Sequence, residues 1–204
     1  MSRSRRSTPR APDASEGVAR LLVGRAAIAE HVARLGREIA ADHPDGVVLV
    51  GVLKGALLFL ADVARQVHEV PVTLEFIALS RYAPDSGRVR ITHDLANDVT
   101  GADLVVVEDI VDTGLTLGYL VRQLEERGAR RVRVCALLDR PVRRIVPLEV
   151  HYRGIEIPDV YALGYGLHHL DLYRNVPEVY EASRASVEAD PDRFVDQLYR
   201  QEPC

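Results

Sequence analysis

The stretch VVVEDIVDTGLTLGYL, residues 105–120, decides the fold. Its first residues are apolar and β-branched, and two adjacent acids, Glu108 and Asp109, follow them. A third acid, Asp112, opens a Thr-Gly turn, after which apolar residues recur with helical spacing. A continuous apolar run is typical of a central parallel strand, because both faces of such a strand are covered. The stretch therefore predicts a buried strand that turns directly into a helix.

The turn itself has the residues of an anion site. Ligands of open α/β sheets bind beyond the carboxyl ends of the strands. Gly114 would let an anion approach the backbone at a helix N-terminus, and Thr113 and Thr116 add hydroxyl donors. Glu108 and Asp109 suit vicinal hydroxyls or a hydrated Mg²⁺. Ordinary helix capping would explain one acid but not three in five residues, so the turn favours a phosphorylated sugar.

Strand-like and helical segments alternate on both sides of this stretch. Residues 25–43 place apolar side chains at helical spacing, and residues 46–53 form an apolar, strand-like run. Such alternation predicts one α/β domain, in which helices cover both faces of a mostly parallel sheet. The further strands are expected at 70–80, 104–108 and 131–139, and the further helices at 55–67 and 115–129.

Lys54 is the only lysine among the 26 basic residues of the chain. It follows an apolar run and lies between Gly51 and Gly55. One interpretation is chance in a composition that is rich in arginine. The other is that this position needs a compact ammonium group, where a planar guanidinium would not fit.

Composition narrows the class of protein. A chain of 204 residues with 47% hydrophobic residues is typical of one globular domain with a sizeable core. The net charge of −4 disfavours nucleic-acid binding, and no apolar run approaches the length of a membrane span. Cys135 and Cys204 do not look like a pair, which favours a reducing cytoplasm. Residues 1–20 are basic and predict a disordered tail, with a nucleic-acid contact as the alternative.

Six segments together resemble one family. VGVLKGALLFLADV, VVVEDIVDTGLTL, LLDRPVRR, GIEIPD, GYGL and LYRNVPEV are similar, in this order, to motifs of the hypoxanthine–guanine branch of the type I phosphoribosyltransferases. The resemblance covers residues 22–180. It implies a type I phosphoribosyltransferase fold in residues 21–182, with a flexible lid loop at about 80–95 and a small hood subdomain at about 140–176.

The resemblance also implies a reaction. A 5-phosphoribosyl group would pass from 5-phosphoribosyl 1-pyrophosphate (PRPP) to a 6-oxopurine base with the help of Mg²⁺. Asp112 would handle a proton of the base, and Lys54 and Arg174 would neutralise the leaving pyrophosphate. The resemblance further implies a cis peptide bond between Leu53 and Lys54. The implied PRPP contacts are Glu108, Asp109, Thr113, Gly114, Leu115, Thr116, Gly55, Ser80, Arg81 and Tyr82, and the implied base contacts are Arg140, Tyr161, Ala162 and Ile110.

Three positions depart from the pattern of the family. His168 stands where the family has an Asp on the metal side, Arg140 where it has a Lys, and Arg81 where it has a Ser. A neutral imidazole is a poor partner for Mg²⁺, and Asp171 would be the substitute. The candidate metal ligands are therefore Glu108, Asp109, His168 and Asp171.

Two alternatives follow from these departures. One is a paralogue that uses a purine-like base such as a 7-deazaguanine in specialised metabolism. The other is a regulator that senses PRPP without catalysis, which the presence of Asp112 and Lys54 disfavours. For the enzyme the expected partners are PRPP and a purine or purine-like base, whereas the regulator would bind RNA or DNA. A homodimer or homotetramer without membrane contact is expected.

Residues 183–204 extend beyond the resemblance. Asp190 suits an N-cap, Pro191 suits the first helical position, and Phe194 and Leu198 are four residues apart. This pattern predicts a short helix that covers the core or makes a subunit contact.

Overall fold

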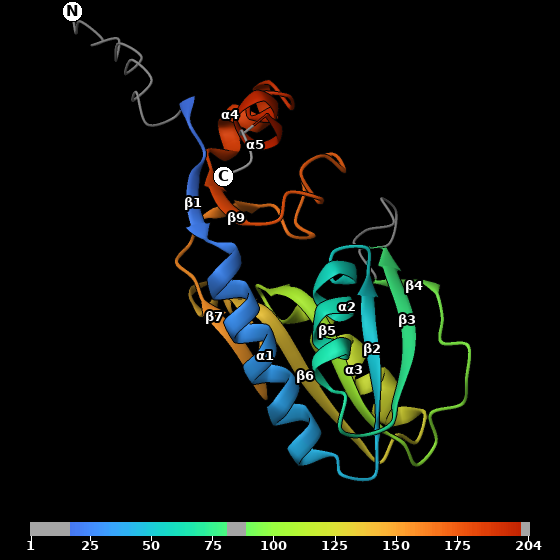
Figure 1. Ribbon diagram of the computed structural model, residues 1–204. Coiled ribbons are helices and arrows are strands. Elements are labelled where there is room, and N and C mark those ends of the chain that lie inside the picture. Colours follow the sequence, from blue (N-terminus) through green and yellow to red (C-terminus); the bar gives the residue numbers. More distant parts are fainter. Residues whose placement is uncertain (1–16, 81–88, 201–204) are drawn as a thin grey trace, which may run out of the picture.

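A computed structural model describes residues 17–80 and 89–200, and its main body is a six-stranded sheet (Figure 1). The strand order is β4-β3-β2-β5-β6-β7, and all neighbours are parallel except β3 and β4. The predicted mostly parallel sheet is therefore confirmed. Its strands are β2 (Val47–Leu53), β3 (Val72–Ser80), β4 (Arg90–His93), β5 (Asp103–Val111), β6 (Arg131–Asp139) and β7 (Tyr152–Glu156).

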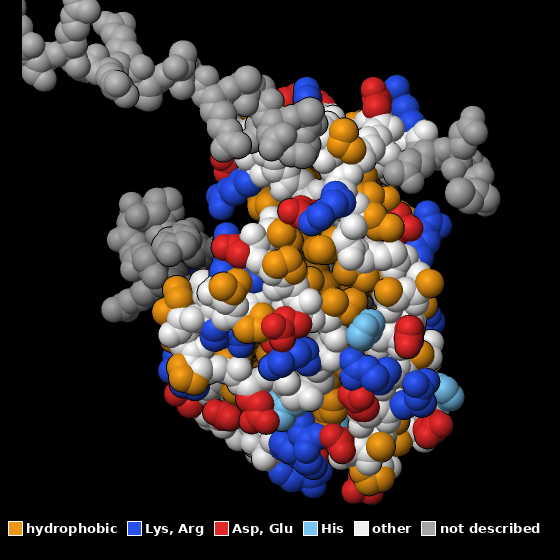
Figure 2. Space-filling view, turned by 90° about the vertical axis from the view of Figure 1, so that its left-hand side faces the viewer, with side chains coloured by type: hydrophobic (Ala, Val, Ile, Leu, Met, Phe, Trp, Pro, Cys, Tyr) orange, Lys and Arg blue, Asp and Glu red, His pale blue; other side chains and the backbone are white. Residues whose placement is uncertain are grey.

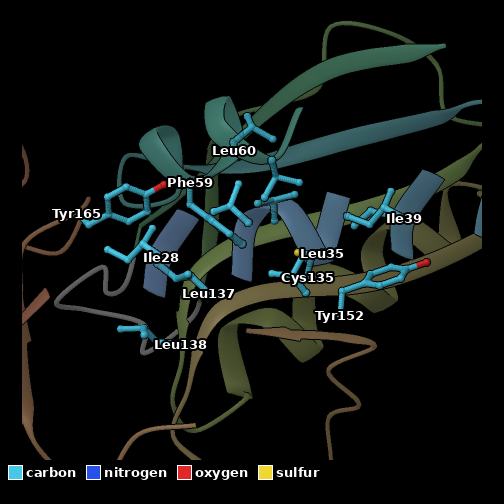
Figure 3. Close-up of a cluster of buried hydrophobic side chains, with 14 of the residues drawn as sticks. Ile28, Leu35, Ile39, Phe59, Leu60, Cys135, Leu137, Leu138, Tyr152 and Tyr165 are labelled. Atoms are coloured by element: carbon cyan, nitrogen blue, oxygen red, sulfur yellow. The ribbon is translucent and has the colours of Figure 1, made fainter. Parts of the chain in front are cut away.

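Helices cover both faces of this sheet. Helices α1 (Arg25–Asp42) and α2 (Leu57–Gln66) lie on one face, and α3 (Leu115–Glu126) lies on the other (Figure 1). On the α1 side, Leu35 and Ile39 pack with Phe59 of α2 in the largest apolar cluster (Figure 3). Among the described helices, none combines the length and apolar character that a membrane span requires.

Strand β5 is central because both of its faces are buried. Val105 and Val107 point into the cluster under α1 and α2, whereas Leu104 and Val106 pack with the side chains of α3. This alternation is the geometry of a strand, whose successive side chains point to opposite faces. It also fixes the end of β5 beside the N-terminus of α3, with Glu108 and Asp109 inside the strand and Asp112 directly after it.

A second, smaller sheet forms a hood above the carboxyl ends of β2, β5 and β6 (Figure 1). Its strands β1 (Arg20–Val23), β9 (Val179–Ala182) and β8 (Tyr161–Leu163) are antiparallel, and the 3₁₀ turn η2 (Pro141–Arg143) follows β6. The apolar core of the hood includes Tyr173, Phe194 and Leu198. The short helices α4 (Arg184–Ala189) and α5 (Val195–Tyr199) therefore cover the core of the hood. Of the two roles expected for residues 183–204, this is the covering of a core; a subunit contact stays a prediction.

The hood joins segments from the two ends of the described chain. Ala19 is buried, its backbone N–H donates to Gln197 Oε1 (2.8 Å), and Gln197 Nε2 donates back to the Ala19 carbonyl (2.6 Å). Ordered structure thus begins before residue 20, where the disordered tail was expected to end. Residues 1–16 lie outside the described residues.

Two further boundaries differ from expectation. Helix α5 begins at Val195 rather than near Pro191, because the Asp190 carboxylate accepts the Asp192 N–H (3.2 Å) in a local turn. Of the expected lid loop, residues 90–93 form β4 and pair with the end of β3. Arg81 and Tyr82 lie outside the described residues.

A polar cluster lies at the opposite, amino end of the parallel strands. His43 follows α1, is buried, and places its Nδ1 3.4 Å from Asp103 Oδ2 and its Nε2 3.1 Å from the Tyr152 hydroxyl. Arg130 and Arg131 bind the same Asp103 carboxylate (2.8 and 2.7 Å). The cluster borders a cavity of about 340 Å³. Figure 2 shows charged side chains gathered at this lower end of the α1 face, below a more apolar region.

Candidate active site

The turn after β5 has the backbone of an anion site. Gly114 has φ 80° and precedes α3, a conformation that favours glycine. The Thr113 carbonyl accepts hydrogen bonds from the N–H groups of Ile145 (2.9 Å) and Val146 (3.2 Å), which hold the turn from behind. The N-terminal N–H groups of a helix favour an anion. The turn of residues 113–116 therefore suits an anion, and phosphate binding there stays a prediction.

Asp112 lies beside a buried arginine. Arg140 Nη1 is 3.2 Å from Asp112 Oδ1, and the Arg140 side chain is only 6% exposed. Burial lowers the pKa of Arg140 from its usual value, and the charges of Asp112 and Asp159 oppose this effect. Arg140 Nε has no hydrogen-bond partner among the described residues. A buried donor without a partner is costly, so a polar group of a ligand would be favoured here.

Arg144 supports the backbone at Asp112, although the sequence motifs assigned it no role. Its Nε donates to the Asp112 carbonyl (2.9 Å), its Nη1 donates to the Leu148 carbonyl (3.1 Å), and its Nη2 pairs with buried Asp139. Three arginines in the five residues 140–144, directly after a strand of the sheet, were the signal available in the sequence. Arg144 fixes the backbone from which Asp112 projects.

The loop that carries Lys54 packs against β5 and the hood. The Leu53–Lys54 peptide bond is cis, as the resemblance implied. A Cβ atom on Gly55 would lie 1.9 Å from Asp109 Oδ2, and a Cβ on Gly166 would lie 2.1 Å from the Gly55 carbonyl oxygen. Asp109 is buried, and its Oδ1 accepts the Ile110 N–H (2.8 Å). The Lys54 loop is thus confined from two sides.

One carboxylate joins the two cations predicted for pyrophosphate. Asp171 Oδ1 accepts hydrogen bonds from Arg174 Nε (3.0 Å) and Nη2 (2.9 Å), and Asp171 Oδ2 lies 3.4 Å from Lys54 Nζ. The bonds from Arg174, and then Lys54, lower the pKa of Asp171. The Lys54 side chain is 69% exposed. The close contacts around Lys54 are at Gly51 and Gly55 rather than at the Lys54 side chain, and the requirement for an ammonium group stays a prediction.

The hood residues predicted to face the base also have neighbours. The Tyr161 hydroxyl is 3.0 Å from His169 Nδ1, and the Arg184 guanidinium lies 5.8 Å from the centre of the Tyr161 ring. Ala162 is buried in β8 and pairs with Glu181 of β9. These contacts fix the orientation of Tyr161, while its contact with a base stays a prediction.

The candidate metal ligands do not form a ready-made cage. Within residues 17–80 and 89–200, no three His, Cys, Asp or Glu side chains are grouped to hold a metal ion. His168 Nδ1 accepts the Asp171 N–H (3.0 Å), and Asp171 is engaged by two cations. Mg²⁺ usually binds through one or two carboxylates together with substrate phosphates and water. The half-buried Glu108, at the end of β5, fits this mode.

Comparison with known proteins gives a consistent result. Residues 24–170 match a family model described as phosphoribosyl transferase domain. A hypoxanthine-guanine phosphoribosyltransferase of Mycobacterium avium is 40% identical over 171 residues, which cover 76% of this chain and 84% of that protein. One of Bacillus subtilis (strain 168) is 36% identical over 166 residues, covering 79% and 92%. A crystal structure of a Staphylococcus aureus hypoxanthine phosphoribosyltransferase superposes with a TM-score of 0.77 at 30% identity, covering 81% of this chain and 92% of that one.

Proposed function

We propose that this chain, which belongs to the phosphoribosyl transferase domain family, transfers the 5-phosphoribosyl group of PRPP to a 6-oxopurine base such as hypoxanthine or guanine. The products would be the nucleoside 5′-monophosphate and pyrophosphate. The observation that carries the proposal is the contact between the buried Arg140 and Asp112, which directly precedes the turn at residues 113–116.

The reaction exchanges two bonds at the anomeric carbon. The bond to the pyrophosphate oxygen breaks, a bond to a purine nitrogen forms, and the purine gives up a proton. Asp112 would accept or return a proton at the base, as a carboxylate within hydrogen-bond reach can; its position beside Arg140 supports this role. Lys54 and Arg174 would hold the departing pyrophosphate, since fixed cations stabilise the charge that develops on a leaving group.

The 5′-phosphate would bind at the turn of residues 113–116. The N–H groups at the start of α3 and the hydroxyls of Thr113 and Thr116 are donors for it, and Glu108 would accept from ribose hydroxyls. Glu108 would help to hold Mg²⁺ bound to PRPP, and the ion would supply charge neutralisation for the pyrophosphate. Asp109, which packs against Gly55, would set the distance between the ribose side and the pyrophosphate loop.

Arg140 and Asp112 also bear on the identity of the base. Arg140 can donate to a 6-oxo group, and Asp112 would face the neighbouring N7 edge. Hypoxanthine and guanine present both features. A 7-deazaguanine keeps the 6-oxo group but has no N7, so it would keep only the contact to Arg140. Residence in the cytoplasm and assembly into a homodimer or homotetramer remain part of the proposal.

Turnover of a panel of bases tests this proposal. The full chain would be incubated with PRPP, Mg²⁺ and hypoxanthine, guanine, xanthine, adenine or 7-cyano-7-deazaguanine, and nucleotide and pyrophosphate would be quantified. Hypoxanthine and guanine should give the highest kcat/KM. Preference for the deaza base would favour the specialised paralogue. Binding of PRPP without turnover of any base would favour a sensor and overturn the proposal.

A further inference from the structure

We propose that Asp171 is a positioning residue that holds Lys54 and Arg174 ready for pyrophosphate, and that His168 holds Asp171. This inference rests on the proposed function, because it concerns how the two cations receive the leaving group. It gives His168, whose position the resemblance assigned to a metal-side acid, a role in backbone support rather than in metal binding.

Asp171 divides its two oxygens between the two cations. Oδ1 accepts from Arg174 Nε and Nη2, and Oδ2 faces Lys54 Nζ at 3.4 Å. Arg174 Nη1 donates to the Gly166 carbonyl (2.6 Å). All three guanidinium nitrogens therefore have a protein acceptor, which fixes the plane of the group. The remaining N–H donors of Nη1 and Nη2 are available to an anion.

The backbone around Asp171 is held in a conformation that few side chains adopt. Leu170 (φ 47°), Asp171 (φ 66°) and Tyr173 (φ 73°) all lie in the left-handed region. Non-glycine residues persist there when surrounding contacts compensate for the strain. His168 supplies one such contact, because its Nδ1 accepts the Asp171 N–H (3.0 Å). The Tyr199 hydroxyl supplies another by accepting the Tyr173 N–H (2.7 Å).

Two opposing effects decide what Asp171 does for an incoming anion. Its charge repels pyrophosphate, but an exposed carboxylate is weakly held by its partners and is readily displaced. The opposing effect is entropic. Lys54 and Arg174 are long side chains, and if they became ordered only when the ligand binds, the lost conformational entropy would lower the affinity. Asp171 orders both before the ligand arrives. We expect ordering to exceed repulsion, so loss of the carboxylate should weaken binding.

The experiment is calorimetric titration of inorganic pyrophosphate into the full chain without metal, in the presence of a chelator. Asp171→Asn should raise the Kd roughly tenfold, the scale that ordering one or two long side chains supplies. The matched control is Asp196→Asn, which removes an acid of α5 that is 79% exposed and paired with Arg200. The control should leave the Kd unchanged.

Other roles of Asp171 give other results. If it is only a repelling surface charge, Asp171→Asn will tighten pyrophosphate binding. If it is only a metal anchor, the variant will bind metal-free pyrophosphate like the wild type. Either result overturns the inference. The double variant Lys54→Met with Asp171→Asn should also bind pyrophosphate more tightly than the sum of the two single losses predicts. Both substitutions disrupt the same Lys54–Asp171 contact, so their effects on binding are not additive.

Two substitutions at His168 separate backbone support from charge. Asn carries an Oδ1 acceptor where His carries Nδ1, so His168→Asn should keep the wild-type Kd for pyrophosphate. His168→Ala removes the acceptor and should weaken binding like Asp171→Asn. Equal behaviour of the two variants overturns the role given to His168.

The proposed function and this inference fail in different ways. If the wild type turns over PRPP and base while Asp171→Asn binds pyrophosphate normally, only the inference fails. If the wild type neither turns over any base nor binds pyrophosphate, both fail.

Discussion

The carboxylate of Asp109 occupies the space that a side chain at position 55 would need. A Cβ atom on Gly55 would lie 1.9 Å from Asp109 Oδ2 and 2.7 Å from Asp109 Cγ. Asp109 is buried and its Oδ1 is bonded to the Ile110 N–H, so it has little freedom to move away. The end of β5 and the loop after β2 therefore pack directly against each other, and the contact is between the Asp109 carboxylate and Gly55.

Gly55→Ala should consequently damage both stability and activity. We expect the free energy of unfolding to fall by about 1–3 kcal/mol, the usual cost of overpacking, and kcat/KM for PRPP to fall with it. Gly118→Ala is the matched control, since its Cβ would meet only Val146 Cγ2 at 3.9 Å. In a helix interior this control should gain about 0.5–1 kcal/mol in urea unfolding. An unchanged Gly55→Ala would mean that the loop relaxes freely.

Asp112→Asn should retain binding of PRPP but lose roughly two orders of magnitude or more in turnover, the scale of general acid–base catalysis. The substitution keeps the size of the side chain and removes the charge that faces Arg140. Steady-state kcat and calorimetric binding of PRPP measure the two effects separately. Turnover at the wild-type level would remove Asp112 from the chemistry.

Arg140→Met should affect the base and spare PRPP. Met fills much of the buried space but cannot donate to a 6-oxo group, and hydrogen bonds to charged groups contribute about 1.5–3 kcal/mol. The KM for the base should therefore rise by roughly one to two orders of magnitude, whereas the Kd for PRPP stays unchanged. Arg140→Lys, which keeps a donor, should lose less. An equal loss of affinity for PRPP would place Arg140 on the other side of the site.

Phe194→Ala should destabilise the hood. Phe194 is fully buried with Tyr173 and Leu198, and removing a buried Phe side chain costs about 3–5 kcal/mol. Base affinity should fall as well, because the predicted base contact Tyr161 lies on the same small sheet. Tyr199→Phe keeps an aromatic ring and removes only the hydroxyl that bonds Tyr173 and Asn175, so it should cost about 1 kcal/mol. Urea unfolding of both variants makes the comparison.

The buried His43 should make stability depend on pH. Burial, followed by the nearby charge of Arg131, lowers its pKa in the folded protein, whereas the unfolded chain takes up this proton near pH 6.5. The unfolded state therefore binds more protons below that pH, and the free energy of unfolding falls as the pH decreases from about 7.5 to 5.5. Arg130 and Arg131 lower the pKa of Asp103, so this carboxylate becomes protonated only at a pH below this window.

His43→Gln should flatten the dependence between pH 7.5 and 5.5 in urea unfolding. His68→Gln, at an exposed position, is the control and should keep the wild-type dependence. If His43→Gln retains the full slope, other groups are responsible for it.

Local patterns were enough to predict β2, β3, β5 and β6 of the main sheet, whereas β4 lies in the expected lid loop and β7 lies in the expected hood. The apolar run at 104–108 and the helical spacing after Gly114 gave β5, α3 and the turn between them, because each signal lies within one short segment. The cis bond before Lys54 followed from resemblance rather than from any pattern of residues.

The hood and the Asp171 contacts depend on segments that are far apart in the sequence. The pairing of β1 with β9 joins Arg20 to Glu181. Each of these strands is too short for its sequence to indicate which strand it pairs with. Asp171 meets Lys54 in a segment where Leu170 and Asp171 adopt positive φ, a conformation that is uncommon for residues other than glycine. The start of α5 was misplaced because Asp190 can cap a helix or close a turn equally well.

The bonds between Ala19 and Gln197 have a consequence for synthesis of the chain. Residues 25–156 contain every strand of the six-stranded sheet and its three helices, so this part can form while translation continues. The hood cannot form at that stage. Its core includes Phe194 and Leu198, and its first strand, β1, pairs with β9, which is synthesised later. During that interval β1 lacks its partner strand β9, although Val23 of β1 can already pack with α1. A nascent chain stalled before residue 194 would thus carry a folded sheet with an open, aggregation-prone upper end, and should be recovered by pull-down as a chaperone-bound species.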